Sequence, residues 1–371
     1  MKTRAAVVYE PGKPIEIEEL ELAGPPGDGE VLIRYTHAGL CHSDVHIQHG
    51  DLPARLPMVL GHEGAGIVEE VGPGVSRVAP GDHVVCSFIP NCGNCRYCAT
   101  GRQSICDMGA AILEGFLPGG KFPLRGPRGD YGTMCMLGTF SQYGLIHQNS
   151  AVKVDDDLPL EKAVLVGCGV PTGWGSAVNT ANVRAGDTVV IYGIGGIGIN
   201  AVQGARYAGA KNVIAIDPLE NKREKAMELG ATHAFATADE ALAAIPDLTR
   251  GQGADSAILT VDVMTAEVIG AGFNAIGKGG VVIVTGLGKL LEPTIQLPGT
   301  ILTLFRKTLK GSLFGDCNPT YDIPKILGLY QAGDLKLDEI ITRTYTLDQV
   351  NEGYDDLLAG KNVRGVIVHE H

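Results

Sequence analysis

Four cysteines lie close together in the first third of the chain. They occur in the segment Cys-Gly-Asn-Cys-Arg-Tyr-Cys-Ala-Thr-Gly-Arg-Gln-Ser-Ile-Cys, at Cys92, Cys95, Cys98 and Cys106. Four thiolates at these spacings suit a closed tetrahedral zinc site, which stabilises a lobe with little core of its own. Four free thiols or an iron–sulfur cluster are the alternatives, although the usual ferredoxin spacing is absent. The sequence therefore predicts a structural zinc site within residues 92–106.

A second set of candidate ligands is spread along the chain. His62 and Glu63 stand among glycines in the stretch 61–75, and burying them without partners would cost several kcal/mol, roughly. A surface histidine in a hairpin is the other interpretation of this stretch. Cys41 in Cys-His-Ser-Asp-Val-His and Cys168 in Gly-Cys-Gly would complete a Cys₂His set with His62, leaving a fourth position for water or substrate. Spacing alone does not bring these three distant residues together.

A glycine-rich turn, Gly-Ile-Gly-Gly-Ile-Gly, marks the middle of the chain. It follows an apolar stretch at 187–193 and opens a predicted helix at 199–210, which is the context that a dinucleotide-binding loop requires. Gly193 would allow the tight turn, Gly195 would let a pyrophosphate approach the backbone, and Gly198 would let the helix pack on the strand. The loop residues assigned to the cofactor are Gly193, Gly195, Gly196, Ile197 and Gly198.

The next predicted strand, 211–217, ends in an acid. Asp217 would accept hydrogen bonds from the adenosine ribose and would repel a 2′-phosphate, so NAD is favoured over NADP. Lys222 and Arg223 follow closely and would soften this choice if they reached the cofactor. We assign Lys222 to the cofactor site and Arg223 to the solvated face of a helix.

The chain as a whole is acidic and long enough for two domains of about 150 residues each. Its 371 residues are 44% hydrophobic, and its formal net charge of −12 argues against nucleic acid or an anionic membrane as a partner. The apolar stretch near the start is too short for a signal peptide, and the stretch 189–202 is too short and too glycine-rich to span a bilayer. We expect a cytoplasmic protein that acts on a small molecule.

Nine cysteines in a chain without a secretion signal are better explained by metal binding than by disulfides. Three of them, Cys86, Cys135 and Cys317, fall outside both ligand sets. We expect these three to be packed thiols.

The N-terminal part has the pattern of strands joined by turns. Apolar and polar residues alternate over 4–37, and further short strands are predicted at 65–71, 83–88 and 143–154. Residues 111–135 carry six glycines and three prolines, so a long loop is predicted there.

From about residue 170, predicted strands and helices alternate. The strands are 187–193, 211–217, 233–236, 256–261 and 281–285, and the helices are 199–210, 221–230, 239–248 and 266–276. This alternation predicts a parallel sheet with helices on both faces. Beyond residue 288 the pattern loosens, with helices predicted at 323–332 and 347–359 and a last strand at 364–369.

Over essentially its whole length the chain resembles the zinc-dependent medium-chain alcohol dehydrogenases. The matching features, in the family's order and near its spacing, are Cys41 with Ser43, Asp44 and His46, the Gly-His-Glu-Gly segment at 61–64, the four-cysteine lobe, Cys168, the glycine loop and Asp217. The resemblance implies an α/β protein. It would have a GroES-like, β-rich catalytic domain (1–169 and 314–371) and an inserted Rossmann NAD-binding domain (170–313) with a doubly wound parallel sheet.

The resemblance also implies a reaction. Cys41, His62 and Cys168 would hold a catalytic zinc ion, and the four-cysteine lobe would hold a structural one. The catalytic ion would favour the alkoxide of a primary alcohol, much as zinc lowers the pKa of bound water from about 15.7 to about 7. Hydride would then pass to NAD, reversibly giving an aldehyde. Ser43 would take the hydroxyl proton and pass it through the cofactor ribose to His46, which would release it to solvent.

Further residues receive roles from the same resemblance. Asp44 would orient the His62 ring, and Glu63 would lie behind the metal as a transient ligand during water exchange. Phe88 and Leu52 would line the substrate channel.

The cofactor would gain three more contacts. His42 and Arg364 would bind the pyrophosphate, and Thr172 would pack beside the nicotinamide. Arg364 could instead be a structural cation in the last strand. Ser43 and His46 could be ordinary loop residues.

Three segments are similar to two groups within the family. They are Leu-Gly-Thr-Phe-Ser from Leu137, Gly-Cys-Gly-Val-Pro-Thr-Gly-Trp-Gly-Ser-Ala from Gly167, and Phe-Gly-Asp-Cys-Asn-Pro-Thr-Tyr-Asp-Ile-Pro-Lys from Phe314. One group is the class III, glutathione-dependent formaldehyde dehydrogenases, which act on S-hydroxymethylglutathione. The other, which looks closer, is the nicotinoprotein (NDMA-dependent) alcohol dehydrogenases, in which NAD stays bound and another acceptor removes the electrons.

Two further alternatives are open. A non-catalytic NAD-binding redox sensor is disfavoured, because catalytically inactive members usually lose metal ligands and this chain keeps all seven. The long segment 111–135 resembles that of the dimeric members, so we expect a homodimer, with a tetramer as the alternative. The sequence does not identify the alcohol or the physiological acceptor.

Overall fold

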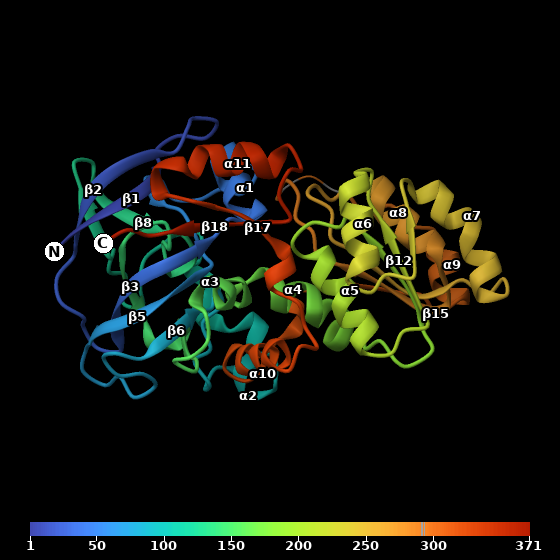
Figure 1. Ribbon diagram of the computed structural model, residues 1–371, viewed down its shortest axis with the longest axis horizontal. Helices are drawn as coiled ribbons and strands as arrows, with labels where there is room; N and C mark the ends of the chain where they lie inside the picture. The colour runs from blue at the N-terminus through green and yellow to red at the C-terminus, as the bar shows by residue number, and fades with distance from the viewer. Residues whose placement is uncertain (291, 293) are drawn as a thin grey trace. The chain divides into compact units, whose positions relative to one another are not determined.

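The computed structural model describes residues 1–290, 292 and 294–371. The chain forms two compact units, both drawn in Figure 1. The first comprises Met1–Cys168, Asn318–Ala332 and Leu337–His371, and the second comprises Gly169–Cys317 and Gly333–Lys336. The predicted domain boundaries, with 170–313 inserted, stay a prediction. No helix among the described residues is both long and apolar enough to cross a membrane.

A small closed barrel forms one part of the first unit. Its strands, in spatial order, are β1 (Lys2–Val8), β2 (Glu16–Leu22), β7 (Leu124–Gly126), β8 (Gly129–Thr133) and β4 (Met58–Val59). Val7, Leu20 and Tyr131 share one buried core inside it. Closing the sheet removes exposed edges, which suits strands this short.

A seven-stranded sheet forms the other part of the first unit and carries the segment with His62 and Glu63. Its order is β10 (Ala151–Lys153), β6 (His83–Cys86), β5 (Gly64–Val71), β3 (Glu30–Gly39), β18 (Arg364–Val368) and β17 (Ile341–Tyr345), with β9 (Tyr143–His147) also pairing with β3. Gly64 starts β5 opposite Ala38 of β3 and Cys86 of β6. His62 and Glu63 therefore stand just before a central strand, where two neighbouring strands fix the backbone.

Five α-helices complete the described part of the first unit. They are α1 (His42–His49), α2 (Arg96–Ala99), α3 (Leu160–Ala163), α10 (Pro319–Gln331) and α11 (Val350–Leu358). The helices α10 and α11 and the strand β18 confirm the elements predicted for the C-terminal part. The sequence pattern did not predict α1, whose polar and apolar residues show no clear helical stripe.

The second unit is built on a six-stranded parallel sheet. Its order is β13 (His233–Phe235), β12 (Asn212–Ile216), β11 (Thr188–Tyr192), β14 (Ala254–Leu259), β15 (Ile276–Val284) and β16 (Thr308–Gly311). All five residues of β11 and of β12 are buried, as expected for central strands covered on both faces. The strand order reverses between β11 and β14, which is the doubly wound arrangement that the sequence predicted.

Six α-helices accompany this sheet. They are α4 (Gly169–Gly175), α5 (Gly198–Tyr207), α6 (Glu220–Glu228), α7 (Ala238–Thr249), α8 (Ala266–Ala275) and α9 (Gly299–Leu304). Val190, Tyr192 and Ile214 pack in one core with residues of α7 and α8, such as Ile245 and Phe273. Right-handed crossovers put α5 and α6 on the opposite face (Figure 1). The predicted alternation of strand and helix is confirmed.

The long loop predicted at 111–135 is wrong in part. This segment contains the paired strands β7 and β8, which close the barrel. Glycine and proline made it look unstructured, but strands of three and five residues need little sequence signal when a barrel supplies their partners. The strands β16 and β17 and the helices α4 and α9 were also not predicted.

Candidate metal centre and cofactor loop

Four buried side chains from distant parts of the first unit converge on one point. The ligand atoms of Cys41, His62, Glu63 and Cys168 all lie within 4.8 Å of one another. Cys41 caps the N-terminus of α1, and Cys168 directly follows a short 3-10 turn at Val164–Gly167. The fold thus brings together the three residues that spacing alone did not connect, and adds Glu63.

The imidazole of His62 is held from one side only. Its Nδ1 atom lies 3.2 Å from Oδ2 of Asp44, whose Oδ1 accepts a hydrogen bond from the Gly61 backbone N–H at 2.8 Å. Both ring nitrogens are buried and make no hydrogen bond among the described residues, and Nε2 also lacks a close approach of the kind that Asp44 makes to Nδ1. Leaving such an atom unpaired costs free energy, so the site fits a metal ion at Nε2 with Asp44 orienting the ring.

The two thiols behave as a pair. A hydrogen bond from Cys168 lowers the pKa of Cys41 well below its ordinary value, while the same contact and burial raise the pKa of Cys168 well above it. The pKa values of the two thiols thus move in opposite directions, because each thiol acts on the other. Burial lowers the pKa of His62, but the Asp44 and Cys41 charges outweigh it and raise that pKa overall.

Glu63 has a cationic partner, Arg364, at the start of β18. Its carboxylate accepts a hydrogen bond from Nη2 of Arg364, and both side chains are buried. A Cβ atom at Gly39 would lie 2.0 Å from Oε2 of Glu63, so glycine is required to leave room for the pair. The predicted pyrophosphate contact of Arg364 stays a prediction, since its observed partner is Glu63.

The helix α1 gathers the other proposed catalytic residues. The Oγ atom of Ser43 lies 3.7 Å from Sγ of Cys41. His46 is buried, and its Nδ1 atom lies 3.0 Å from Oδ2 of Asp51, whose side chain is 22% exposed. The predicted release of a proton from His46 to solvent stays a prediction. Asp51, which the sequence analysis missed, is the neighbour that reaches water.

The remaining residues predicted near the metal also lie on or beside these elements. The Phe88 ring meets His62 edge-on at a centroid distance of 5.9 Å. The backbone N–H of Leu52 donates to the carbonyl of His46 at 3.2 Å. The ring of His42, which is half-buried, stands 5.6 Å from the ring of His46.

The four cysteines of the lobe also converge. Sγ of Cys92 lies 3.9 Å from Sγ of Cys98, and Sγ of Cys95 lies 4.0 Å from Sγ of Cys106. A tetrahedral zinc ion with Zn–S bonds of about 2.3 Å separates its sulfurs by about 3.8 Å. Backbone N–H groups of Cys95 and Cys98 already donate to the preceding ligand sulfurs. The lobe therefore fits a closed four-thiolate zinc site.

The glycines of the loop before α5 have different reasons to be glycine. Gly193 has a φ of +84°, which favours glycine. A Cβ atom at Gly198 would lie 1.9 Å from the carbonyl oxygen of Gly193, so close packing excludes one. At Gly195 no described atom lies within 4 Å of a Cβ atom. The protein itself does not require glycine at 195, so the open space fits an approaching pyrophosphate.

Asp217 is tied to this loop by its carboxylate. Oδ2 accepts the Ile194 backbone N–H at 2.8 Å, and Oδ1 accepts the Leu219 backbone N–H at 2.9 Å. The Arg223 guanidinium turns back to the carbonyls of Asp217 and Pro218 at 2.9 and 2.8 Å. Nη1 of Arg223 is thus used by two backbone carbonyls.

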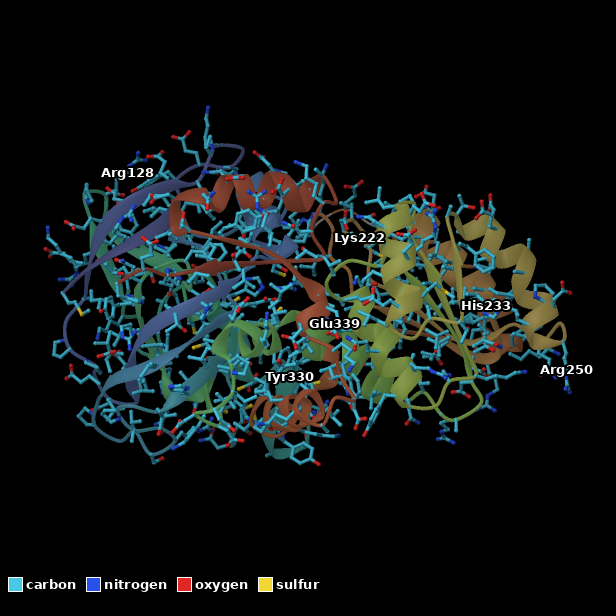
Figure 2. All side chains as sticks on the ribbon, viewed as in Figure 1. Arg128, Lys222, His233, Arg250, Tyr330 and Glu339 are labelled. Atoms are coloured by element: carbon cyan, nitrogen blue, oxygen red, sulfur yellow. The ribbon has the colours of Figure 1, made fainter. Side chains whose placement is uncertain are left out.

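Lys222 stands on α6, as Figure 2 shows. Its side chain is buried, and burial lowers its pKa, while the Asp217 and Asp262 carboxylates oppose that change. The Asp217 and Asp262 carboxylates therefore offset part of the effect of burial on the Lys222 ammonium.

Thr172, on α4, is also buried, and its carbonyl accepts a hydrogen bond from the Ser176 hydroxyl at 2.6 Å.

Comparison with known proteins identifies the family. Residues 27–156 match the alcohol dehydrogenase GroES-like domain, and residues 196–332 match the zinc-binding dehydrogenase family. The NDMA-dependent alcohol dehydrogenase of Amycolatopsis methanolica is 64% identical over 369 residues, covering 100% of this chain and 99% of that protein. The chain belongs to the zinc-dependent medium-chain alcohol dehydrogenase family. It is an oxidoreductase of the alcohol dehydrogenase class, acting on a small molecule.

Solved structures agree with this alcohol dehydrogenase fold. An alcohol dehydrogenase zinc-binding domain protein from Burkholderia ambifaria is 35% identical with a TM-score of 0.93, and each chain covers 100% of the other. Benzyl alcohol dehydrogenase from Acinetobacter calcoaceticus is 32% identical with a TM-score of 0.92, again with 100% coverage of both chains. The predicted fold class, a GroES-like part with a Rossmann-like parallel sheet, is confirmed.

Two residues of this alcohol dehydrogenase escaped the sequence analysis. Asp51 had a weak signal at most, since only Gly50 marked a turn before it and the helix that ends there was itself not predicted. Arg77, which approaches the cysteine lobe, had no signal, because it lies fourteen positions before Asn91 in a loop whose path only the fold defines.

Proposed function

We propose that this alcohol dehydrogenase uses zinc and NAD to oxidise a primary alcohol reversibly to an aldehyde. The observation that carries the proposal is the convergence of two buried thiols, Cys41 and Cys168, with the partnerless Nε2 atom of His62. Sulfur and imidazole nitrogen are the usual donors to zinc, and a set of three leaves a position for substrate. The four thiols of residues 92–106 would hold a second, structural ion.

When bound, zinc supplies a Lewis acid for the alcohol hydroxyl, and NAD supplies the hydride acceptor. The protein orients the ligand side chains and places them in a buried site that also contains the Glu63–Arg364 ion pair. Asp44 holds the His62 ring through Nδ1 and so keeps Nε2 available as a donor. Glu63 lies within reach of the same point, paired with Arg364, and would act as the transient ligand.

The proton would leave along α1. Ser43, beside Cys41, would accept the hydroxyl proton at Oγ, and His46, on the same helix, would carry the proton onward. Asp51 would hold the His46 ring in place through its contact with Nδ1. The proton would then reach solvent through Asp51, whose side chain is partly exposed.

NAD is proposed in preference to NADP. Asp217 accepts a hydrogen bond from the glycine loop through Oδ2 and one from Leu219 through Oδ1. An acid at the end of this strand would accept the adenosine ribose hydroxyls and repel a 2′-phosphate. Arg223 faces backbone carbonyls, and Lys222 is balanced by Asp217 and Asp262. Support for the cofactor roles of His42, Thr172 and Arg364 comes from the family resemblance.

The nicotinoprotein version of this function is also favoured by a specific observation. The relative from Amycolatopsis methanolica, 64% identical along its length, is named for its dependence on NDMA. A chain that keeps its NAD bound would reduce it with the alcohol and reoxidise it in place with an external acceptor. In that version the two half-reactions would share one site, and free NAD would not be consumed.

We also propose a homodimer formed through β16. Among the described strands, β16 pairs only with β15 and so leaves one edge of the parallel sheet open. Nearby apolar side chains are exposed, including Leu304 at 70% and Leu313 at 41%. Backbone pairing between two such edges would satisfy the open hydrogen-bonding groups and cover apolar surface. Light scattering of the purified protein, with Leu304→Asp as a disruptive variant, tests it.

The function is tested by metal analysis and turnover of the same preparation. We expect about two zinc ions per chain, alcohol-dependent reduction of NAD, and retention of NAD through dialysis if the nicotinoprotein version holds. Cys41→Ser should lose one zinc ion and at least about 100-fold of activity, since a Lewis acid is worth several kcal/mol. NAD binding should stay unchanged. Full activity of the Cys41→Ser protein would overturn the proposal.

A further inference from the structure

A guanidinium group approaches the cysteine lobe from outside its own segment. Arg77 lies on the loop between β5 and β6, far from residues 92–106 in sequence. Its Nη2 atom donates a hydrogen bond at 2.7 Å to the carbonyl oxygen of Asn91, the residue directly before Cys92. The loop thus places the positively charged Arg77 side chain next to the first residues of the cysteine lobe.

The lobe needs such a charge when it holds zinc. Four thiolates exceed the charge of one Zn²⁺ ion by two, and the backbone N–H groups of Cys95 and Cys98 contribute only dipoles. Cys98 and Cys106 are buried, so water screens this excess poorly. A nearby cation would lower the free energy of the loaded lobe.

The Nη1 atom of Arg77 is a hydrogen-bond donor that the described residues leave unused. Its Nη1 atom is buried and has no hydrogen-bond partner among the described residues, which would be costly if it stayed so. Burial lowers the pKa of Arg77, and the thiols of Cys92, Cys98 and Cys106 act in the opposite direction. The guanidinium therefore lies within electrostatic reach of three of the four proposed ligands, with unused donors.

The other cations of the lobe are placed differently. Arg102 stacks on the Tyr97 ring at 5.2 Å and donates to Oγ1 of Thr100 at 3.1 and 3.2 Å. Arg96 is exposed. Neither is a buried donor without a partner, so Arg102 provides a matched control on the same lobe.

We propose that Arg77 is the positioning cation of the four-cysteine zinc site, which offsets the charge of its thiolates while Nη2 holds the carbonyl of Asn91 next to Cys92. This inference rests on the proposed structural zinc. Outer-shell partners of metal ligands typically contribute about 10- to 100-fold to metal affinity. Loss of Arg77 should therefore speed release of the lobe zinc by about that factor, without affecting the ligands at Cys41, His62 and Cys168.

The test compares zinc release to a chromogenic chelator from wild type, Arg77→Gln and Arg102→Gln. Alkylation of the released thiols, followed by peptide mass analysis, reports whether the peptide containing 92–106 or those containing Cys41 and Cys168 lost metal. We expect fast release and labelling within 92–106 for Arg77→Gln only. Arg77→Lys, which keeps the charge, should restore part of the retention.

One more variant separates the charge from a merely structural role. Asn91 is anchored by its side chain, which donates to Asn318 and Thr320 at 2.7 and 3.0 Å. Asn91→Ala loosens this anchor but keeps Arg77, so it should release zinc more slowly than Arg77→Gln. Equal release by Arg77→Gln and Arg102→Gln, or by Arg77→Gln and Asn91→Ala, would overturn the role of Arg77. A wild-type lobe without zinc would instead overturn the proposed structural site.

Discussion

His46 and Asp51 contact each other at the C-terminal end of α1, where Nδ1 of His46 lies 3.0 Å from Oδ2 of Asp51. Gly50 ends α1 with a φ of +83°, and the backbone N–H of Asp51 returns to the His46 carbonyl at 2.9 Å. The glycine therefore folds the acid back over the buried histidine. The same short helix begins at a proposed metal ligand, Cys41, and ends at a carboxylate that reaches solvent.

Asp51→Asn should impair proton release while leaving the metal sites intact. We expect kcat to fall about 10-fold, a part of the roughly 10²–10⁴-fold that a positioned proton carrier contributes. The defect should show a solvent deuterium isotope effect larger than that of wild type. High concentrations of imidazole buffer should restore the rate, because an external base replaces the blocked exit. Steady-state kinetics at several buffer concentrations measure this.

His49→Asn is the matched control for Asp51→Asn. His49 is exposed at the last position of α1, so its loss should change neither the rate nor the buffer dependence. Asp51→Glu should recover part of the activity. A lowered rate in Asp51→Asn that buffer cannot restore would point to a structural defect in α1 and would contradict the relay.

Asp217→Asn should shift the choice of cofactor. The change removes a negative charge that would accept ribose hydroxyls, and hydrogen bonds to charged groups contribute about 1.5–3 kcal/mol. We expect NAD to bind at least about 10-fold more weakly and the ratio of NADP to NAD affinity to rise. Titrations of nucleotide-free protein measure both constants. Glu228→Gln, an exposed acid on α6, should change neither.

The fold was predictable where its signal is local. The strands and helices from β11 to β15 follow periodic apolar stretches, and the glycine loop between β11 and α5 has the spacing that the cofactor chemistry demands. The strands β7 and β8 could not be predicted in the same way. Their few residues gain stability from barrel partners that are distant in sequence, such as Glu21 opposite Arg125 and Met58 opposite Gly132.

The predictability of the site residues also depends on whether their signal is local in sequence. The lobe of residues 92–106 was predictable because its four ligands are neighbours in sequence. Cys41, His62 and Cys168 were joined only through a resemblance, since their convergence depends on how the seven-stranded sheet is assembled. Asp51 and Arg77 act through tertiary contacts with a helix turn and a loop. Neither residue type is unusual for a surface, so composition gave no reason to single them out.

His369 should make the protein less stable in acid. Burial lowers its pKa to about 4, helped by His371 and His37, and its Nε2 donates to the Thr139 carbonyl at 2.9 Å. The unfolded histidine titrates near 6.5, so between pH 6.5 and about 4 the unfolded state binds more protons. Stability is therefore full above about pH 6.5 and falls by up to roughly 3 kcal/mol as the pH drops toward 4.

His369→Gln should flatten this dependence, since the amide can still donate to Thr139 but does not titrate. Denaturant unfolding at several pH values from 4 to 8 measures the slope, roughly one proton at most in the acid range. His49→Gln, at an exposed position, should leave the slope as in wild type. An unchanged slope for His369→Gln would mean that other groups carry the acid sensitivity.

Gly195→Ala tests the cofactor loop without disturbing the fold. No described atom lies within 4 Å of a Cβ atom at 195, and its φ lies outside the left-handed region. The nucleotide-free variant should therefore melt at or slightly above the wild-type temperature, because alanine restricts the unfolded chain. Its methyl group would occupy the space of the pyrophosphate, so NAD affinity should fall by at least about 10-fold, or 1.4 kcal/mol.

Gly198→Ala should instead lower the melting temperature, since its Cβ atom would lie 1.9 Å from the Gly193 carbonyl oxygen. Wild-type NAD affinity in Gly195→Ala would show that this turn does not receive the pyrophosphate.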